Sequence, residues 1–331
     1  MVSDWPRAIA QGWHPVAYRP EVRARPLPIQ LLGENLVAFR DADGGIAVLQ
    51  DRCPHRGVPL SQGRLRDGTL VCPYHGWRFA GDGRLVEVPG ARTCPPVKAR
   101  ALPVREDAGL VWTCLAADPP PFPDLPPVMS DPALDRFWWP LAPSRAGLLD
   151  ALENHLDPAH PHFVHPWLVR PPTARRTTRV EVRSGPWGAE ARYIEQRANR
   201  ALLSAVMEGE RKAGIGRLWP PTCGEVRLEN ARGAMLSIAV VFSPLDHDLT
   251  RPYAHFASTR GLLPAWFKRA ALKLFHLPVL AQDRRMLGWQ ADARGPGGFA
   301  FGPLDVLARS ILRHAHGEPS PEEEASFELD L

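Results

Sequence analysis

The strongest signal in this chain is a pair of short segments, Cys53-Pro54-His55-Arg56-Gly57 and Cys72-Pro73-Tyr74-His75-Gly76-Trp77. Each segment brings a cysteine and a histidine together, and each has a glycine four residues after the cysteine. Thiolates and neutral imidazoles are both metal ligands, and glycine lets the backbone pass close to a bound group. The two segments therefore predict one metal centre held between two loops.

The mixed pairs distinguish between two kinds of centre. Structural zinc sites usually pair like residues, as in C-x2-C followed by H-x3-H, and rarely begin with C-x-H. In an iron–sulfur cluster, two thiolates can hold one iron and two imidazoles the other, which raises the reduction potential. We therefore predict a [2Fe-2S] cluster and rank a structural zinc ion second. The cluster ligands are Cys53, His55, Cys72 and His75.

The residues around the two loops indicate how the chain is organised. Residues 29–115 consist of short apolar runs separated by turns, which is typical of an antiparallel β domain. The proline density of residues 118–127 excludes a helix or a central strand there. Later residues mix strand-like runs with helical stretches at about 147–163, 264–276 and 279–292. We predict an α+β fold, with an antiparallel β domain (1–117), a proline-rich linker (118–127), a mixed antiparallel-sheet and helix domain (128–316) and an acidic, loosely packed tail (317–331).

Composition narrows the class of protein. A chain of 331 residues with 44% hydrophobic residues has room for two cores. Its net charge of +4 is not gathered into a basic run, so we expect no nucleic-acid partner. Five cysteines, two of them in the metal pattern, do not suggest a disulfide framework, and without a secretory signal we expect the cytoplasm. Charges interrupt the apolar stretch Leu262–Ala281, which indicates an amphipathic helix rather than a membrane span, with peripheral membrane contact as the alternative.

A second group of candidate ligands lies in the segment from Glu153 to His165. Histidine and carboxylate side chains are both metal ligands. The segment contains four histidines and an aspartate, so these residues alone leave the choice of ligands open. The candidates are His155, Asp157, His160, His162 and His165.

Both cysteine–histidine loops resemble those of the Rieske domain, and the order of the domains resembles the oxygenase α subunits of the Rieske non-haem iron oxygenases. The late segment containing Asp283 is most similar to the branch of vanillate and dicamba O-demethylases. The resemblance implies a helix-grip-like catalytic domain with a mononuclear iron. The family motif D-x2-H-x4-H matches Asp157, His160 and His165.

The resemblance also implies a role for each matched residue. His160, His165 and Asp283 would bind the iron, and Asp157 would bridge an iron histidine to a cluster histidine of a neighbouring subunit. Asn154, one helical turn before Asp157, matches an asparagine that supports the site in the monooxygenase branch. His155 and His162 remain alternative ligands, although we favour hydrogen-bonded roles for both.

The implied function is that of an enzyme, a terminal oxygenase that takes electrons from a partner reductase or ferredoxin and uses O2 to oxidise an aromatic or alicyclic compound. The chain has no G-x-G-x-x-G after a strand, so a nicotinamide or flavin site is not expected. Homotrimers are typical of the family. We favour monooxygenation, with a ring cis-dihydroxylating dioxygenase and a Rieske electron-transfer protein without active mononuclear iron as alternatives. Candidate pocket aromatics are Trp187, Trp219, Phe242, Phe256 and Trp289.

Overall fold

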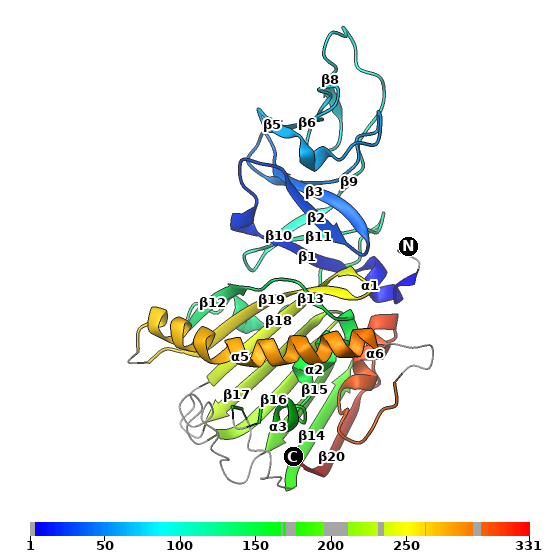
Figure 1. The fold of residues 1–331 in the computed structure, drawn as a ribbon. Helices are drawn as coiled ribbons and strands as arrows, with labels where there is room; N and C mark the ends of the chain where they lie inside the picture. Colours follow the sequence, from blue (N-terminus) through cyan, green and yellow to red (C-terminus); the bar gives the residue numbers. More distant parts are fainter. Residues whose placement is uncertain are drawn as a thin grey trace. The chain divides into compact units, whose positions relative to one another are not determined.

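The structure is a computed structural model, and it describes residues 4–166, 168–169, 177–194, 211–230, 235–261, 263–293 and 299–331. The chain forms two compact units (Figure 1). The described part of the first unit comprises residues 4–5, 10–122 and 243–246. The second comprises residues 6–9 and the described residues of 123–242 and 247–331. The α+β class expected from the sequence is confirmed.

The first unit is built from three small antiparallel sheets. One has the order β1 (Trp13–Tyr18), β11 (Leu110–Cys114), β10 (Val104–Asp107). The second has the order β2 (Leu27–Leu31), β3 (Glu34–Arg40), β4 (Ile46–Gln50), β9 (Ala101–Leu102). The third has the order β5 (Arg64–Arg66), β6 (Thr69–Val71), β7 (Arg78–Phe79), β8 (Leu85–Glu87). Short 3-10 turns are η2 (Arg19–Glu21) and η3 (Leu60–Gln62), and α1 (Arg7–Gln11) precedes β1.

A hydrophobic core connects two of these sheets and includes the two motif cysteines. Cys53 and Cys72 are both 2% exposed and pack in one cluster with Phe39, Leu60 and Phe79. Each of these three large side chains contributes about 1.5–3 kcal/mol by leaving water. The loops that carry the predicted cluster ligands therefore stand on a well-packed base.

The second unit is organised around a nine-stranded antiparallel sheet, as far as the described ranges show. Its path is β12 (Leu134–Pro140), β19 (Leu249–Thr259), β18 (Met235–Asp246), β17 (Cys223–Asn230), β16 (Arg211–Trp219), β15 (Gly188–Ile194), β14 (Thr177–Gly185), β20 (Glu323–Asp330), with β13 (Ser144–Arg145) beside β19. Helices cross this sheet (Figure 1). They are α2 (Leu148–Leu156), α3 (Pro161–Val164), α5 (Ala265–Asp292) and α6 (Ala308–His316), and η4 (Pro127–Met129) precedes β12.

The helix expected at about 147–163 is two helices, because two prolines punctuate it. Asp157 has φ −72° and ψ 124°, outside the helical region, since a residue before a proline disfavours that region. α2 therefore ends at Leu156, and Pro161 occupies the first turn of α3, where its missing N–H is harmless. The break leaves Asp157 and His160 in a turn between the two helices.

Two other expectations about the second half are corrected. The helices expected at 264–276 and 279–292 are one helix, α5, which continues through Pro278. A proline inside a helix removes one hydrogen bond, and packing along α5 outweighs that loss. The tail is not loosely packed throughout, because β20 pairs with β14 from Thr177↔Asp330 to Ser184↔Glu323. Its acidic side chains stay exposed at the sheet edge, as their charge requires.

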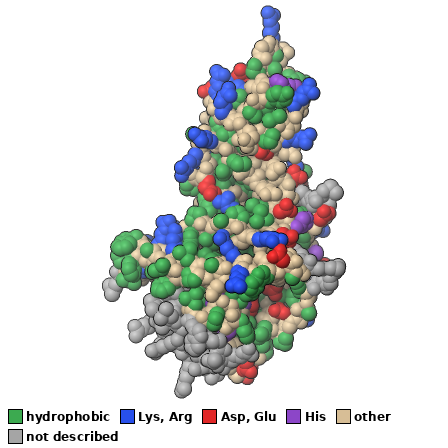
Figure 2. Space-filling view, in the orientation of Figure 1, with side chains coloured by type: hydrophobic (Ala, Val, Ile, Leu, Met, Phe, Trp, Pro, Cys, Tyr) green, Lys and Arg blue, Asp and Glu red, His purple; other side chains and the backbone are tan. Residues whose placement is uncertain are grey.

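α5 is less buried than the sequence suggested. Leu272 and Leu287 are buried, but Trp266 is 71% exposed and Leu274 is 68% exposed. Figure 2 shows hydrophobic side chains gathered along the arm that α5 forms in Figure 1, with basic side chains nearby. Among the helices in the described ranges, none has the length and apolar composition needed to cross a bilayer.

Candidate metal centres

The two cysteine–histidine loops share one backbone frame. In each loop, the glycine four residues after the cysteine donates its N–H to the cysteine carbonyl, and the cysteine N–H donates to the carbonyl one residue further on. The pairs are Gly57 N to Cys53 O (2.8 Å), Cys53 N to Val58 O (2.9 Å), Gly76 N to Cys72 O (3.1 Å) and Cys72 N to Trp77 O (2.8 Å). Both glycines have positive φ, +73° and +71°, which a side chain would disfavour.

The four predicted cluster ligands lie together at the tips of these loops. The rings of His55 and His75 are 4.8 Å apart, and the His55 ring stacks on Trp77 at 4.4 Å. Burial lowers the pKa of His55, with further lowering by His75, so its ring is neutral and free to bind a metal. Burial and the neighbouring Cys72 raise the pKa of the Cys53 thiol. Two buried thiols and two adjacent imidazoles fit a [2Fe-2S] group, which would replace the thiol protons.

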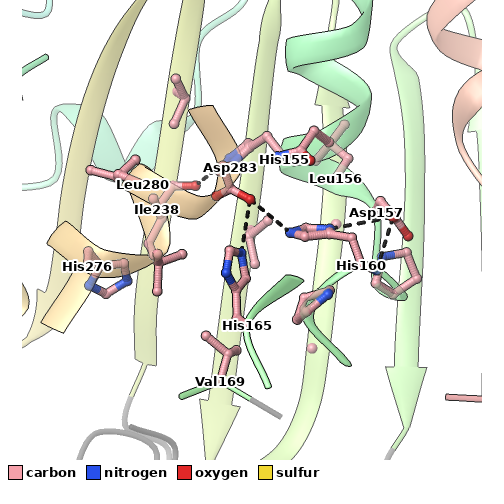
Figure 3. A pocket seen from close by; sticks show the side chains of 18 of the residues that line it. His155, Leu156, Asp157, His160, His165, Val169, Ile238, His276, Leu280 and Asp283 are labelled. Atoms are coloured by element: carbon pink, nitrogen blue, oxygen red, sulfur yellow. Dashed lines mark hydrogen bonds and ion pairs between the residues drawn. The ribbon is translucent and has the colours of Figure 1, made fainter. Parts of the chain in front are cut away.

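The three predicted iron ligands come together in the second unit (Figure 3). His160 and His165 flank the short helix α3, and Asp283 lies on α5. Oδ1 of Asp283 is 2.9 Å from Nε2 of His165 and 3.7 Å from Nε2 of His160. One ligand atom from each residue lies within 4.8 Å of the others. Residues separated by more than one hundred positions thus present a two-histidine, one-carboxylate set.

The contacts within this set fit a cation better than a closed hydrogen-bond network. Nε2 of His165 and Oδ1 of Asp283 are close, yet neither forms an aligned hydrogen bond with any described group. His165 is only 1% exposed, and burial alone would lower its pKa, but Asp283 and Gln282 outweigh burial and raise it. The same negative potential that favours an imidazolium favours a metal ion, so the donor set suits Fe(II).

Neighbouring side chains orient the two histidines. Nδ1–H of His165 donates to Oε1 of Gln282 at 2.8 Å, which leaves Nε2 facing Asp283. Asp157 accepts the backbone N–H groups of Ala159 (2.7 Å) and His160 (3.1 Å). Its Oδ2 also lies 3.5 Å from Nδ1 of His160. A hydrogen-bonded partner of this kind fixes the tautomer and direction of a metal-binding imidazole, as Gln282 does for His165, whereas Asp157 approaches Nδ1 of His160 without an aligned hydrogen bond. Gln282 was missed at first, although its position next to Asp283 was a usable signal.

The other predicted residues of this region lie beside the ligand set. Nε2 of His155 donates to the Ile238 carbonyl at 3.2 Å, and burial lowers the pKa of His155 to about 4. This ring is therefore neutral and bound to the sheet backbone. His162 is buried, and Asn154 is half-buried; both face the same cavity as the ligands.

Glu153 is a titratable residue that the sequence reasoning did not single out. Burial, together with the charges of Asp305, Asp157 and Asp150, raises its pKa to about 7. A signal was present, because Asp150 lies three residues before Glu153 on the same face of α2 and Asp157 follows just beyond the end of the helix. A carboxyl group with a raised pKa thus lies on α2, within the electrostatic influence of Asp157.

A cavity of about 1040 Å³ adjoins the ligand set within the second unit. Of the aromatic residues expected at a pocket, Phe242 and Phe256 line it. Trp187 and Trp289 are instead 40% and 50% exposed, and Trp219 donates its indole N–H to Glu225 inside the sheet layer. These three tryptophans are therefore not among the described lining residues.

Comparison with known proteins identifies the first unit. Residues 12–103 match the family described as the Rieske [2Fe-2S] domain. The 3-chlorobenzoate-3,4-dioxygenase oxygenase subunit of Comamonas testosteroni is 35% identical over 163 residues, 46% of this chain and 37% of the relative. A probable 3-ketosteroid-9-alpha-monooxygenase oxygenase component of Rhodococcus rhodochrous is 34% identical over 173 residues, 50% of this chain and 43% of the relative. The match thus spans less than half the length of these curated relatives.

Solved structures match along nearly the whole chain. Dicamba monooxygenase bound to dicamba has a TM-score of 0.80 at 21% identity, and the match covers 93% of this chain and 96% of that one. NdmA of Pseudomonas putida CBB5 with caffeine has a TM-score of 0.77 at 20% identity, covering 96% and 98%. Because these sequences are only 20–21% identical to this chain, the structural similarity establishes the fold alone. Residues 12–103 therefore form a Rieske [2Fe-2S] domain, and about half of the chain is similar in sequence to oxygenase components that carry such a domain.

Proposed function

We propose that the chain is the terminal oxygenase component of a Rieske-type system, and that it monooxygenates an aromatic or alicyclic compound, by hydroxylation or O-demethylation. The single observation that supports this most is the approach of Asp283 to His160 and His165 beside a large cavity. When bound, the [2Fe-2S] cluster supplies single electrons and the mononuclear iron supplies dioxygen activation.

The proposal gives each group of residues a task. Cys53, His55, Cys72 and His75 hold the cluster, and His160, His165 and Asp283 hold the iron, with Asp157 and Asn154 as supporting residues. Asp157 keeps the His160 ring in place while its backbone contacts keep the turn closed. The domain limits 1–117, 118–127, 128–316 and 317–331 remain part of the proposal.

Electrons must come from outside the chain, because no dinucleotide-binding motif is present in the sequence. We therefore include a reductase or ferredoxin as the partner, a small organic molecule as the substrate, and a homotrimer as the assembly. The cytoplasm, where thiols stay reduced, is the expected compartment.

The test is to purify the protein anaerobically, count iron per chain and record low-temperature EPR after dithionite. Three irons per chain falling to two in Asp283→Ala, with an unchanged reduced Rieske signal, is the expected result. Asp292→Ala is the matched control, because Asp292 lies on the same helix but pairs with Arg145 (2.7 Å) away from the ligands. It should keep three irons.

Other outcomes separate the alternatives. Two irons per chain in both the wild type and Asp283→Ala would favour a Rieske electron-transfer protein and would contradict an oxygenase. A missing Rieske signal would contradict the whole proposal. With three irons present, two adjacent hydroxyl groups labelled from ¹⁸O₂ would indicate ring cis-dihydroxylation, whereas one labelled atom would support monooxygenation.

A further inference from the structure

The cavity beside the metal ligands has a predominantly apolar wall. At about 1040 Å³ it lies at the upper end of the range for small-molecule sites, roughly 300–1,000 Å³. The sheet supplies one side with Ile215, Val226, Leu228, Leu236, Ile238 and Val240. Val279 and Leu280 of α5 also line it (Figure 3 labels Ile238 and Leu280). Such a wall suits a molecule with several rings rather than a small, heavily substituted polar one.

The charges around the cavity disfavour an anionic ligand. Among the described lining residues, Arg284 is the one with a permanent positive charge. Its guanidinium is already engaged, because Nε donates to Ser144 Oγ at 3.0 Å and Nη2 donates to the Ala142 carbonyl at 2.6 Å. Three carboxylates also line the cavity; bound iron would offset that of Asp283, and those of Asp157 and Asp330 would remain. A carboxylated substrate would therefore meet repulsion and little compensation.

Apart from the candidate metal ligands, Tyr193 is the cavity-lining residue with a buried polar atom that has no hydrogen-bond partner among the described groups. It lies on β15, is 7% exposed and lines the cavity, and its hydroxyl forms no hydrogen bond with any described group. Burial raises the pKa of Tyr193, and the charge of Asp157 raises it further, so the hydroxyl keeps its proton and can donate. A buried donor without an acceptor is unfavourable, and a ligand that supplies the acceptor removes that penalty.

We propose that the cavity accepts an uncharged, bulky, multi-ring compound with a carbonyl or ether oxygen, and that the Tyr193 hydroxyl donates a hydrogen bond to that oxygen. The proposal rests on the proposed function for the chemistry, but binding itself needs no turnover. Tyr193 lines the same cavity as Asp157 and His160. Tyr193 would thereby position the substrate relative to His160, which Asp157 orients.

The test is anaerobic calorimetric binding of three probes with one skeleton to the iron-loaded protein: 9-fluorenone, fluorene and fluorene-9-carboxylate. Fluorenone and fluorene differ only by a carbonyl in place of a methylene. One hydrogen bond corresponds to about a fivefold difference in Kd, so wild type should bind fluorenone about fivefold more tightly than fluorene. The carboxylate should bind most weakly.

The variant Tyr193→Phe should bring the fluorenone and fluorene affinities together. Tyr253→Phe, which alters another buried tyrosine that does not line the cavity, should keep the fivefold ratio. An unchanged ratio in Tyr193→Phe would overturn the role of Tyr193. Carboxylate binding that is tighter than ketone binding, or no binding of any probe, would overturn the substrate class. If the chain is not an oxygenase, the number of irons per chain would reveal it, independently of these binding measurements.

Discussion

Removing the charge of Glu153 should stabilise the second unit at alkaline pH and have little effect at acidic pH. The pKa of this carboxyl is raised from 4.5 to about 7 in the folded protein, mainly by burial. The folded state therefore binds a proton more tightly than the unfolded chain. Stability falls as the pH rises from 4.5 to about 7, and it stays lower above that range.

The magnitude follows from this rise in pKa. Each tenfold change in proton affinity is worth 1.36 kcal/mol, so a rise from 4.5 to about 7 corresponds to about 3 kcal/mol at most. Partial contact of the side chain with water reduces this, and we expect about 1–2 kcal/mol. Glu153→Gln should therefore raise the free energy of unfolding by about 1–2 kcal/mol at pH 8 and by a small fraction of that at pH 5.

The assay is urea unfolding of the metal-free protein, followed by circular dichroism at both pH values. Metal is left out because a cation near Asp157 would itself lower the pKa of Glu153. Glu328→Gln, which alters an exposed residue of β20, is the control for a general change in net charge. An equal gain at pH 5 and pH 8, or a loss of stability at pH 8, would refute the reasoning.

Three further outcomes are expected. Gly76→Ala should lower the cluster absorbance per chain more than Gly90→Ala does. A Cβ at position 76 would lie 3.0 Å from Cγ of Pro89, whereas a Cβ at position 90 would have nothing within 4 Å. Equal losses of absorbance in the two variants would contradict this explanation. Gln282→Leu should weaken Co(II) binding about 10–100-fold in a spectroscopic titration, because Nδ1 of His165 loses its acceptor, and unchanged affinity would exclude that role. Co(II) affinity should also fall as the pH is lowered through the raised pKa of His165, because protons compete with the metal for Nε2. The metal-free protein should lose the stabilising imidazolium as the pH rises through the same pKa. A Co(II) affinity that does not depend on pH would contradict both expectations.

The sequence was most informative where function depends on local spacing. All four predicted cluster ligands lie within two short segments, so their pairing could be predicted from the sequence alone. Asp157, His160 and His165 also lie within nine residues, from 157 to 165. Asp283 came from a family resemblance, because no local pattern connects it to His165 across the sheet.

The remaining features depend on packing that composition does not reveal. β20 pairs through its backbone, so its acidic side chains resemble those of a solvated tail. α5 continues through Pro278 because contacts with neighbouring elements outweigh one lost hydrogen bond. Tyr193 is an ordinary strand residue in the sequence, and its unpaired hydroxyl is evident only once the cavity is formed.

α5 serves two sites at once, because it carries Asp283 and also contributes Val279 and Leu280 to the cavity wall. The proposed metal and the proposed substrate would both contact this helix, which gives a physical route for thermodynamic linkage between them. If substrate changes the affinity for metal by some factor, metal must change the affinity for substrate by the same factor. Preparations with incomplete metal would then report a mixture of two substrate affinities. Dissociation constants measured on this protein are therefore comparable only at equal metal content.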